Sequence, residues 1–247
     1  MTTTSFVKTL KRCVAVLLFA PALATAAAVL PLDRAPVSND PIRLQNGAKL
    51  FVNYCMGCHS ASFMRYNMLT GIGLTEEQIT DNLIFSGGKV GDLMTIAMRP
   101  ADGKAWFGAP PPDLTLVARQ RNSAAGSGAD WLYTYLRQFY RDPERPTGWN
   151  NPLFPNVGMP HVLWQLQGDQ VAATDEQGNI TLSLAKPGTM TVEQYDEAVA
   201  DLVSFLSWMS EPIAEKRKNI GYFVLLFLAG MFVLSYALKK NYWRDVH

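Results

Sequence analysis

The longest uninterrupted run of apolar residues lies close to the C-terminus. Residues 220–238 contain no charged side chain, and three basic residues flank the run on each side. About twenty apolar residues in an α-helix can cross a hydrocarbon core about 30 Å thick. The pattern therefore predicts one transmembrane helix at 220–238, within a membrane anchor at 214–238 and followed by a tail at 239–247. A buried core helix is the alternative, but the basic flanks and the aromatic residues near both ends favour a membrane span.

A shorter apolar run lies near the N-terminus. It follows three basic residues and ends in small residues that include Ala24-Thr25-Ala26. This order is typical of a secretory signal peptide with an A-x-A cleavage site, and it predicts a signal at 1–26. Export also decides the orientation of the anchor, because the basic residues on its two sides are balanced. We expect a single-pass protein of the bacterial inner membrane, with residues 27–213 in the periplasm and the tail at 239–247 in the cytoplasm.

Helix-start signals predict that residues 27–213 form one mainly α-helical domain with long loops. Asp40-Pro41 combines an N-cap residue with a first-turn proline, so a helix is expected to begin there and run towards residue 55. Thr75 and Gln78 have the spacing of a capping box, which predicts a helix that ends at about Phe85.

Two further helices are predicted in the second half of this domain. Asp130 is a candidate N-cap for a short aromatic-rich helix at 131–140. Thr191 and Gln194 form another capping box, and an apolar stripe at spacings of three and four follows it. We expect this stripe to pack against the helix that begins at Asp40-Pro41. Its members are Val192, Tyr195, Val199, Leu202, Phe205, Leu206 and Met209. The remaining segments are expected to be loops.

The most specific chemical signal is Cys55-Met56-Gly57-Cys58-His59. At this spacing two thiols can add to the vinyl groups of one haem, and the adjacent imidazole can bind the iron. The motif occurs once, so it predicts one covalently attached haem c, with Cys55 and Cys58 as the thioether residues and His59 as an axial ligand.

A Cys-x-x-Cys pair also occurs in two other kinds of site. A structural zinc site needs two further ligands, but the other histidines are only His161 and His247. A thioredoxin-like redox pair needs a strand before its first cysteine, whereas residues 44–54 have a helical pattern. Removal of the signal would also remove Cys13, so the exported chain would keep only two cysteines, both of them in the haem motif.

An electron carrier needs a second axial ligand on its haem iron. Met159 lies in the proline- and asparagine-rich loop 150–160, next to Gly158, and such a stiff irregular loop suits a distal thioether ligand. We therefore predict Met159 as the second axial ligand, with His161 as the alternative. Other methionines are too close to His59 in sequence or have helical spacing typical of core packing: Met64, Met68, Met94 and Met98.

Charge is distributed unevenly along the chain. Residues 27–213 contain 13 basic and 19 acidic side chains, a net charge of −6, although the whole chain is close to neutral. An acidic surface can capture a basic diffusing partner at a high rate. From sequence alone, the negative charge is explained equally well if it only keeps the domain soluble.

Together these features resemble the cytochrome c1 family, which provides the haem c subunit of the ubiquinol-cytochrome c reductase, or cytochrome bc1, complex. The resemblance covers nearly the whole mature chain. It rests on the signal, the Cys55–His59 motif, Pro111-Pro112-Asp113-Leu114 followed by Arg119 and Arg121, the Asn151-Pro152-x-Phe154-Pro155 loop with Gly158-Met159, and the lone C-terminal span.

The resemblance implies that His59 and Met159 are the axial pair and that Arg119 neutralises a haem propionate. A partly buried carboxylate needs such a bidentate cationic partner. It also implies a place beside cytochrome b and the Rieske iron-sulfur protein in a dimeric membrane complex. There the chain would pass electrons from the Rieske protein to a soluble or membrane-tethered cytochrome c, with no bond chemistry of its own.

Two other functions stay open at this point. A free-standing membrane-tethered cytochrome c that donates to a terminal oxidase has the same motifs, but would not purify with a b-type cytochrome. A haem peroxidase or another oxygen-handling protein needs an open iron position, which ligation by Met159 would deny.

Overall fold

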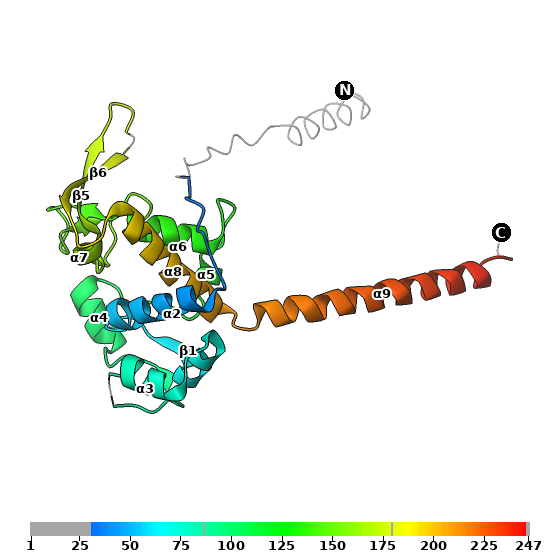
Figure 1. Cartoon of the computed structure of the whole chain (residues 1–247). Coiled ribbons are helices and arrows are strands. Elements are labelled where there is room, and N and C mark those ends of the chain that lie inside the picture. The colour runs from blue at the N-terminus through cyan, green and yellow to red at the C-terminus, as the bar shows by residue number, and fades with distance from the viewer. Residues whose placement is uncertain (1–30, 86, 179, 246–247) are drawn as a thin grey trace, which may run out of the picture. The chain divides into compact units, whose positions relative to one another are not determined.

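The structure is a computed structural model and describes residues 31–85, 87–178 and 180–245. The signal peptide predicted at 1–26 lies outside the described residues. Figure 1 shows the arrangement of the helices and strands.

Helix α2 (Pro41–Leu50) leads directly into the Cys55–His59 motif. It begins as predicted, because the Asp40 side chain accepts hydrogen bonds from the backbone N–H groups of Ile42 and Arg43. After Leu50 the helix widens into the π-helical turn η1 (Phe51–Cys55). The first cysteine of the motif is therefore the last residue of a continuous helical segment.

Helix α8 (Val192–Ser210) is the longest helix of the domain that precedes the anchor. It begins with the predicted capping box, in which the side chains of Thr191 and Gln194 each accept the other's backbone N–H. Six members of the predicted apolar stripe are buried, and the exception is Val192, which is 59% exposed in the first turn.

Helices α2 and α8 pack closely against each other, as predicted (Figure 1). A Cβ atom at Gly47 would overlap the Asp201 carbonyl oxygen and would lie 2.6 Å from the Cβ of Phe205. The rings of Phe51 and Phe205 meet with their centroids 5.6 Å apart. An ion pair of 2.6 Å between Arg43 and Asp201 lies beside this contact.

Helix α6 (Gly128–Arg137) and the short α5 (Val117–Gln120) also contact α8. The prediction that Asp130 is the N-cap of this helix was wrong. Ser127 is the N-cap and accepts the Asp130 N–H, while the Asp130 carboxylate reaches back to the Ser127 N–H from the third helical position. The helix also ends earlier than expected, at Arg137.

The remaining elements of the domain are shorter than α2, α6 and α8. Helix α3 begins at the predicted box of Thr75 and Gln78 and ends at Leu83, two residues before the expected end. The short strands form two antiparallel pairs, β1 with β2 and β3 with β4. The elements are β1 (Ala61–Arg65), the 3-10 helix η2 (Tyr66–Ile72), α3 (Glu76–Leu83), β2 (Leu93–Met94), α4 (Pro100–Phe107), β3 (Tyr140–Arg141), β4 (Trp149–Asn150) and α7 (Trp164–Gln167).

A β-hairpin precedes α8, in a segment that was expected to be loop. Strands β5 (Gly168–Thr174) and β6 (Ile180–Pro187) pair antiparallel, with a register shift between Asp169 and Gln170. Most of its residues are exposed. The expectation of loop was wrong: Ile180, Leu182 and Leu184 alternate with small or polar residues in β6, which is the period-two pattern of a strand, and only β5 has few large apolar residues.

Helix α9 (Ala214–Tyr242) is 29 residues long, and none of its residues is buried. Among the described residues it is the one helix long and apolar enough to cross a membrane. It contains the whole segment 220–238 and continues to Tyr242, beyond the predicted end of the anchor at 238. The fold is therefore mainly α-helical with a single C-terminal apolar helix, as expected from the sequence.

Candidate functional site

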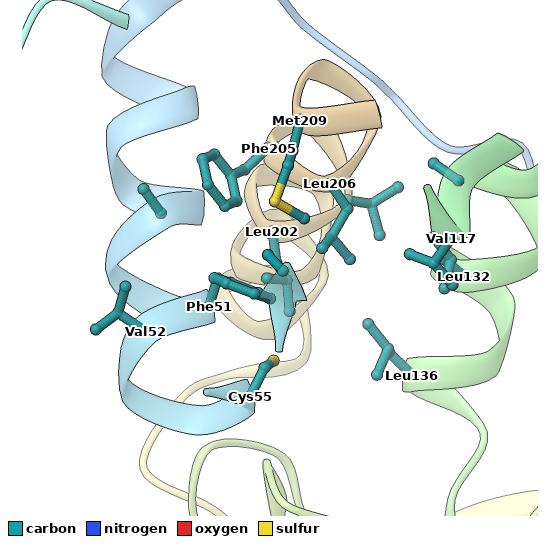
Figure 2. Packing of buried hydrophobic residues seen from close by; sticks show 14 of the residues in the cluster. Phe51, Val52, Cys55, Val117, Leu132, Leu136, Leu202, Phe205, Leu206 and Met209 are labelled. Carbon is teal, nitrogen blue, oxygen red and sulfur yellow. The ribbon is translucent and has the colours of Figure 1, made fainter. Parts of the chain in front are cut away.

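A cavity of about 300 Å³ lies where the Cys55–His59 turn, α5, α6, α8 and the loop 150–160 meet. Its volume is at the lower end of the range for cofactor sites, which runs from about 300 to 1,000 Å³. Figure 2 shows part of its wall, with side chains of α8 between Cys55 on one side and α5 and α6 on the other. The aliphatic side chains from these helices that line it are Val117, Leu132, Leu136, Leu202 and Leu206.

Cys55, Cys58 and His59 all line this cavity. The turn that presents them is held by the Cys55 carbonyl oxygen, which accepts the N–H groups of Cys58 at 3.0 Å and His59 at 2.9 Å. Cys55 and Cys58 are not joined by a disulfide. Burial, with a smaller contribution from nearby Cys58, raises the pKa of the Cys55 thiol to about 12. Redox-active thiols have lowered pKa values, so this environment does not fit a thioredoxin-like pair.

The orientation of the His59 ring is fixed by the backbone. Its Nδ1 lies 2.7 Å from the Pro112 carbonyl oxygen, and because a carbonyl can only accept, Nδ1 carries the proton. Burial lowers the pKa of His59, while the Pro112 hydrogen bond and nearby Asp113 act in the opposite direction. The ring is therefore a neutral imidazole with an unprotonated Nε2, the form that binds a metal.

The segment that supplies the Pro112 carbonyl is itself anchored. The Asp113 carboxylate accepts hydrogen bonds from the Thr115 N–H and hydroxyl at 2.8 and 2.6 Å, and from the Ser62 N–H at 2.7 Å. Burial alone would raise the pKa of Asp113, but these hydrogen bonds outweigh it and lower the pKa. The Leu114 N–H also donates to the Ser60 carbonyl oxygen at 2.9 Å. The partner of His59 is thus held against strand β1.

Met159 lines the same cavity from the loop 150–160. Two asparagines fix the start of this loop. The buried Asn151 amide donates to the Tyr135 carbonyl oxygen at 2.8 Å, and the Asn150 side-chain oxygen accepts the N–H groups of Asn151 and Asn156 at 2.9 Å each. The loop therefore holds Met159 against α6.

Gly158 allows this loop to approach α4. A Cβ atom at this position would lie 2.6 Å from the Phe107 carbonyl oxygen, closer than real Cβ atoms come, so a larger residue would have to displace the loop or the end of α4. Phe107 itself lines the cavity. The absence of a side chain at Gly158 thus sets the distance between Met159 and this part of the wall.

His161, the alternative to Met159, does not line the cavity. It is 2% exposed and stacks on Phe139 with ring centroids 5.0 Å apart, and its edge faces Trp149 at 4.9 Å. Burial, its largest influence, lowers the pKa of His161 to about 4. The structure therefore places the thioether, and not the second imidazole, beside the Cys55–His59 motif.

Arg119 also lies outside the cavity lining. Its side chain is 59% exposed and pairs with Glu211 at 3.4 Å. Arg121 lines the cavity, and its guanidinium lies 4.3 Å from the ring centroid of Trp131, another lining residue. The sequence contained both arginines, but their spacing does not show which one faces the site. Arg119 lies within α5, whereas Arg121 is the non-helical residue that follows it.

These residues fit a covalently bound haem. One mainly apolar cavity is lined by two thiols at the attachment spacing, a neutral imidazole, a thioether and an arginine.

Comparisons with known proteins agree with this chemistry. Residues 88–246 match the model of the Cytochrome C1 family. Over 217 residues the chain is 52% identical to a protein of Nitrosomonas europaea named ammonia monooxygenase gamma subunit. The match covers 87% of this chain and 89% of that protein. It is 48% identical over 216 residues to cytochrome c1 of Allochromatium vinosum, covering 84% of this chain and 86% of that one. The mitochondrial cytochrome c1 haem protein of Saccharomyces cerevisiae is 26% identical over 231 residues, covering 84% and 68%.

The two arginines provide a matched test of the site. Replacing Arg121 with Gln removes a positive charge at the cavity, so the ferric state is favoured and the midpoint potential should fall by about 50 mV, close to a tenfold change for a one-electron couple. Arg119→Gln removes an equal charge from an exposed ion pair and should move the potential much less, because solvent screens it. Redox titration of both variants measures this. An equal fall in both, or a larger fall in Arg119→Gln, would contradict the placement.

Proposed function

The chain belongs to the cytochrome c1 family, and from this premise we propose that its cavity holds the covalent haem c of the family between His59 and Met159. The protein is a membrane-anchored electron carrier of the cytochrome bc1 complex, beside cytochrome b and the Rieske protein, and is not an enzyme by itself. The observation that carries the site proposal is that His59 and Met159, 100 residues apart in sequence, line one cavity together with both cysteines.

Each residue has a defined task in this proposal. Bound haem supplies a one-electron couple between ferrous and ferric iron. Cys55 and Cys58 hold it through thioether bonds, and His59 presents Nε2 because its Nδ1 donates to Pro112. Met159 would supply the thioether ligand, so that the iron could change its charge without gaining or losing a ligand.

The position of Arg121 supports a role at a haem propionate. Arg121 lines the cavity, and its guanidinium is held by contact with the Trp131 ring. A planar guanidinium can bind a carboxylate through two hydrogen bonds. We therefore propose that Arg121 contacts the haem propionate, a role that the resemblance gave to Arg119. Arg119 would act only through its ion pair with Glu211.

Ligation by Met159 is tested by replacing the thioether. Met159→Leu keeps the approximate volume but removes the sulfur, so the far-red optical band of iron–methionine coordination should disappear and the midpoint potential should fall. Met64→Leu is the matched control, because Met64 is a buried core methionine outside the cavity lining, and its variant should keep the band. Persistence of the band in Met159→Leu would reject Met159 as the ligand.

Membership of a complex can be tested by purification from native membranes. The chain should purify with a b-type cytochrome and an iron-sulfur protein, whose reduced-minus-oxidised spectra identify them. Isolation of the chain alone would favour a free-standing tethered cytochrome c. Because one relative carries the name of a monooxygenase subunit, the same preparation should also be assayed for ammonia oxidation, and copurified monooxygenase activity would favour that second function.

We also propose that the haem domain, 27–213, faces the periplasm, that the segment 214–238 anchors it, and that the tail 239–247 is cytoplasmic. The predicted signal at 1–26 supports export of the domain. Helix α9 supports the anchor, since it is long and apolar and none of its residues is buried. The net charge of −6 on residues 27–213 supports a basic cytochrome c, soluble or tethered, as the electron acceptor. The dimeric state of the complex is what the resemblance implies.

Orientation and acceptor can be tested together. Spheroplasts supplied with a quinol should reduce a basic cytochrome c added outside, whereas sealed inside-out vesicles should do so only after addition of detergent. The rate should fall steeply as salt rises from about 0.01 to 0.15 M, since the Debye length shortens from about 30 to 8 Å. Reduction by the sealed inside-out vesicles would contradict the orientation. A rate that does not change with salt would contradict the acidic docking surface.

A further inference from the structure

Tyr135 is a polar side chain in contact with the proposed iron ligand Met159, and the function above does not use it. It lies on α6, is 8% exposed and lines the cavity. Its hydroxyl lies 3.6 Å from the Met159 sulfur, in a geometry in which the O–H donates to the thioether. A thioether is a weak acceptor and a phenol is a good donor, so the direction of this hydrogen bond is fixed by the chemistry of the two groups.

The Tyr135 ring is held independently of the loop 150–160, which carries Met159. It stacks on Trp131 with centroids 4.7 Å apart and planes inclined by 17°, and it meets Phe139 edge-on at 5.0 Å. Two aromatic contacts leave the ring little freedom, so the direction in which the hydroxyl points is set by packing within α6 and its neighbours.

The backbone of Tyr135 holds the start of the loop 150–160. The Tyr135 carbonyl oxygen accepts the Asn151 amide at 2.8 Å. This contact does not depend on the phenol. The hydroxyl can therefore be removed while the anchor of the loop remains, which separates an electronic role of the hydroxyl from a structural role of the residue.

We propose that the Tyr135 hydroxyl is a positioning and tuning group that donates a hydrogen bond to the Met159 sulfur and raises the midpoint potential of the haem. A donor to the sulfur withdraws electron density that the thioether would otherwise give to the iron, and ferric iron needs that density more than ferrous iron does. Hydrogen bonds to axial ligands are one of the means by which a protein sets a haem potential. The inference rests on the proposed ligation by Met159.

The test is Tyr135→Phe in the full-length holoprotein, followed by redox titration and optical spectroscopy. The ferrous–ferric equilibrium should shift three- to tenfold towards ferric, which is a fall of about 30 to 60 mV for one electron. The far-red band should remain, because Phe keeps the ring contacts and the backbone bond to Asn151. Tyr133→Phe is the matched control: Tyr133 is on the same helix, is equally buried and lies outside the cavity lining, so its variant should keep the wild-type potential.

A double variant shows whether the effect passes through the sulfur. In a Met159→Leu background there is no thioether to accept the hydrogen bond. There Tyr135→Phe should change the ferrous–ferric equilibrium constant by less than twofold. The same shift in both backgrounds would overturn the inference.

The outcomes also separate this inference from the proposed ligation. If wild type has the band and Met159→Leu loses it, but Tyr135→Phe leaves the potential at the level of the Tyr133→Phe control, the inference fails and the ligation stands. Loss of the band in Tyr135→Phe would also overturn the inference, because the hydroxyl would then hold the loop and not tune the sulfur. If Met159→Leu keeps the band, the ligation and the inference both fail.

Discussion

The close contact between α2 and α8 determines where the chemistry of this protein can occur. Gly47 lets the backbones approach until a Cβ atom there would overlap the Asp201 carbonyl oxygen, and Phe51 packs on Phe205 one turn further along. Because α2 continues through η1 to Cys55, this contact also fixes the cysteines. The same α8 supplies Leu202 and Leu206 to the cavity wall. One helix pair thus positions both the proposed attachment site and the apolar surface that faces it.

The two proposed iron ligands are held in different ways. His59 follows the helical segment, and a backbone carbonyl, that of Pro112, selects its tautomer. Met159 lies on an irregular loop, but that loop is bound by Asn150 and Asn151 and is in close contact with α4 at Gly158. A loop fixed at this many points behaves as part of the scaffold. A nearly constant ligand geometry in both oxidation states favours fast electron transfer, because little has to move when the electron arrives.

The sequence predicted those parts of the structure that depend on local chemistry. The N-cap at Asp40, the capping boxes at Thr75 and Thr191 and the Cys55–His59 turn use residues a few positions apart, so their spacing is visible in the chain. The cap of α6 was misplaced because Ser127 and Asp130 are both good capping residues, and their roles follow from which side chain reaches which N–H group.

Contacts between distant residues could not be predicted in this way. Which of Arg119 and Arg121 faces the cavity depends on how α5 is rotated against α8. That His161 lies against Phe139, outside the cavity, depends on packing by residues more than twenty positions away. The contact between the Tyr135 hydroxyl and Met159 needs both α6 and the loop 150–160 in place. These features follow from tertiary packing, which has no signature of fixed spacing.

The central claim is that one iron is bound between the imidazole of His59 and the thioether of Met159. X-ray absorption spectroscopy at the iron edge of the purified protein measures this most directly, because sulfur and nitrogen scatter differently. The account predicts one sulfur and five nitrogen neighbours in both oxidation states. A first shell of six nitrogens, or of five ligands with an open position, would contradict it.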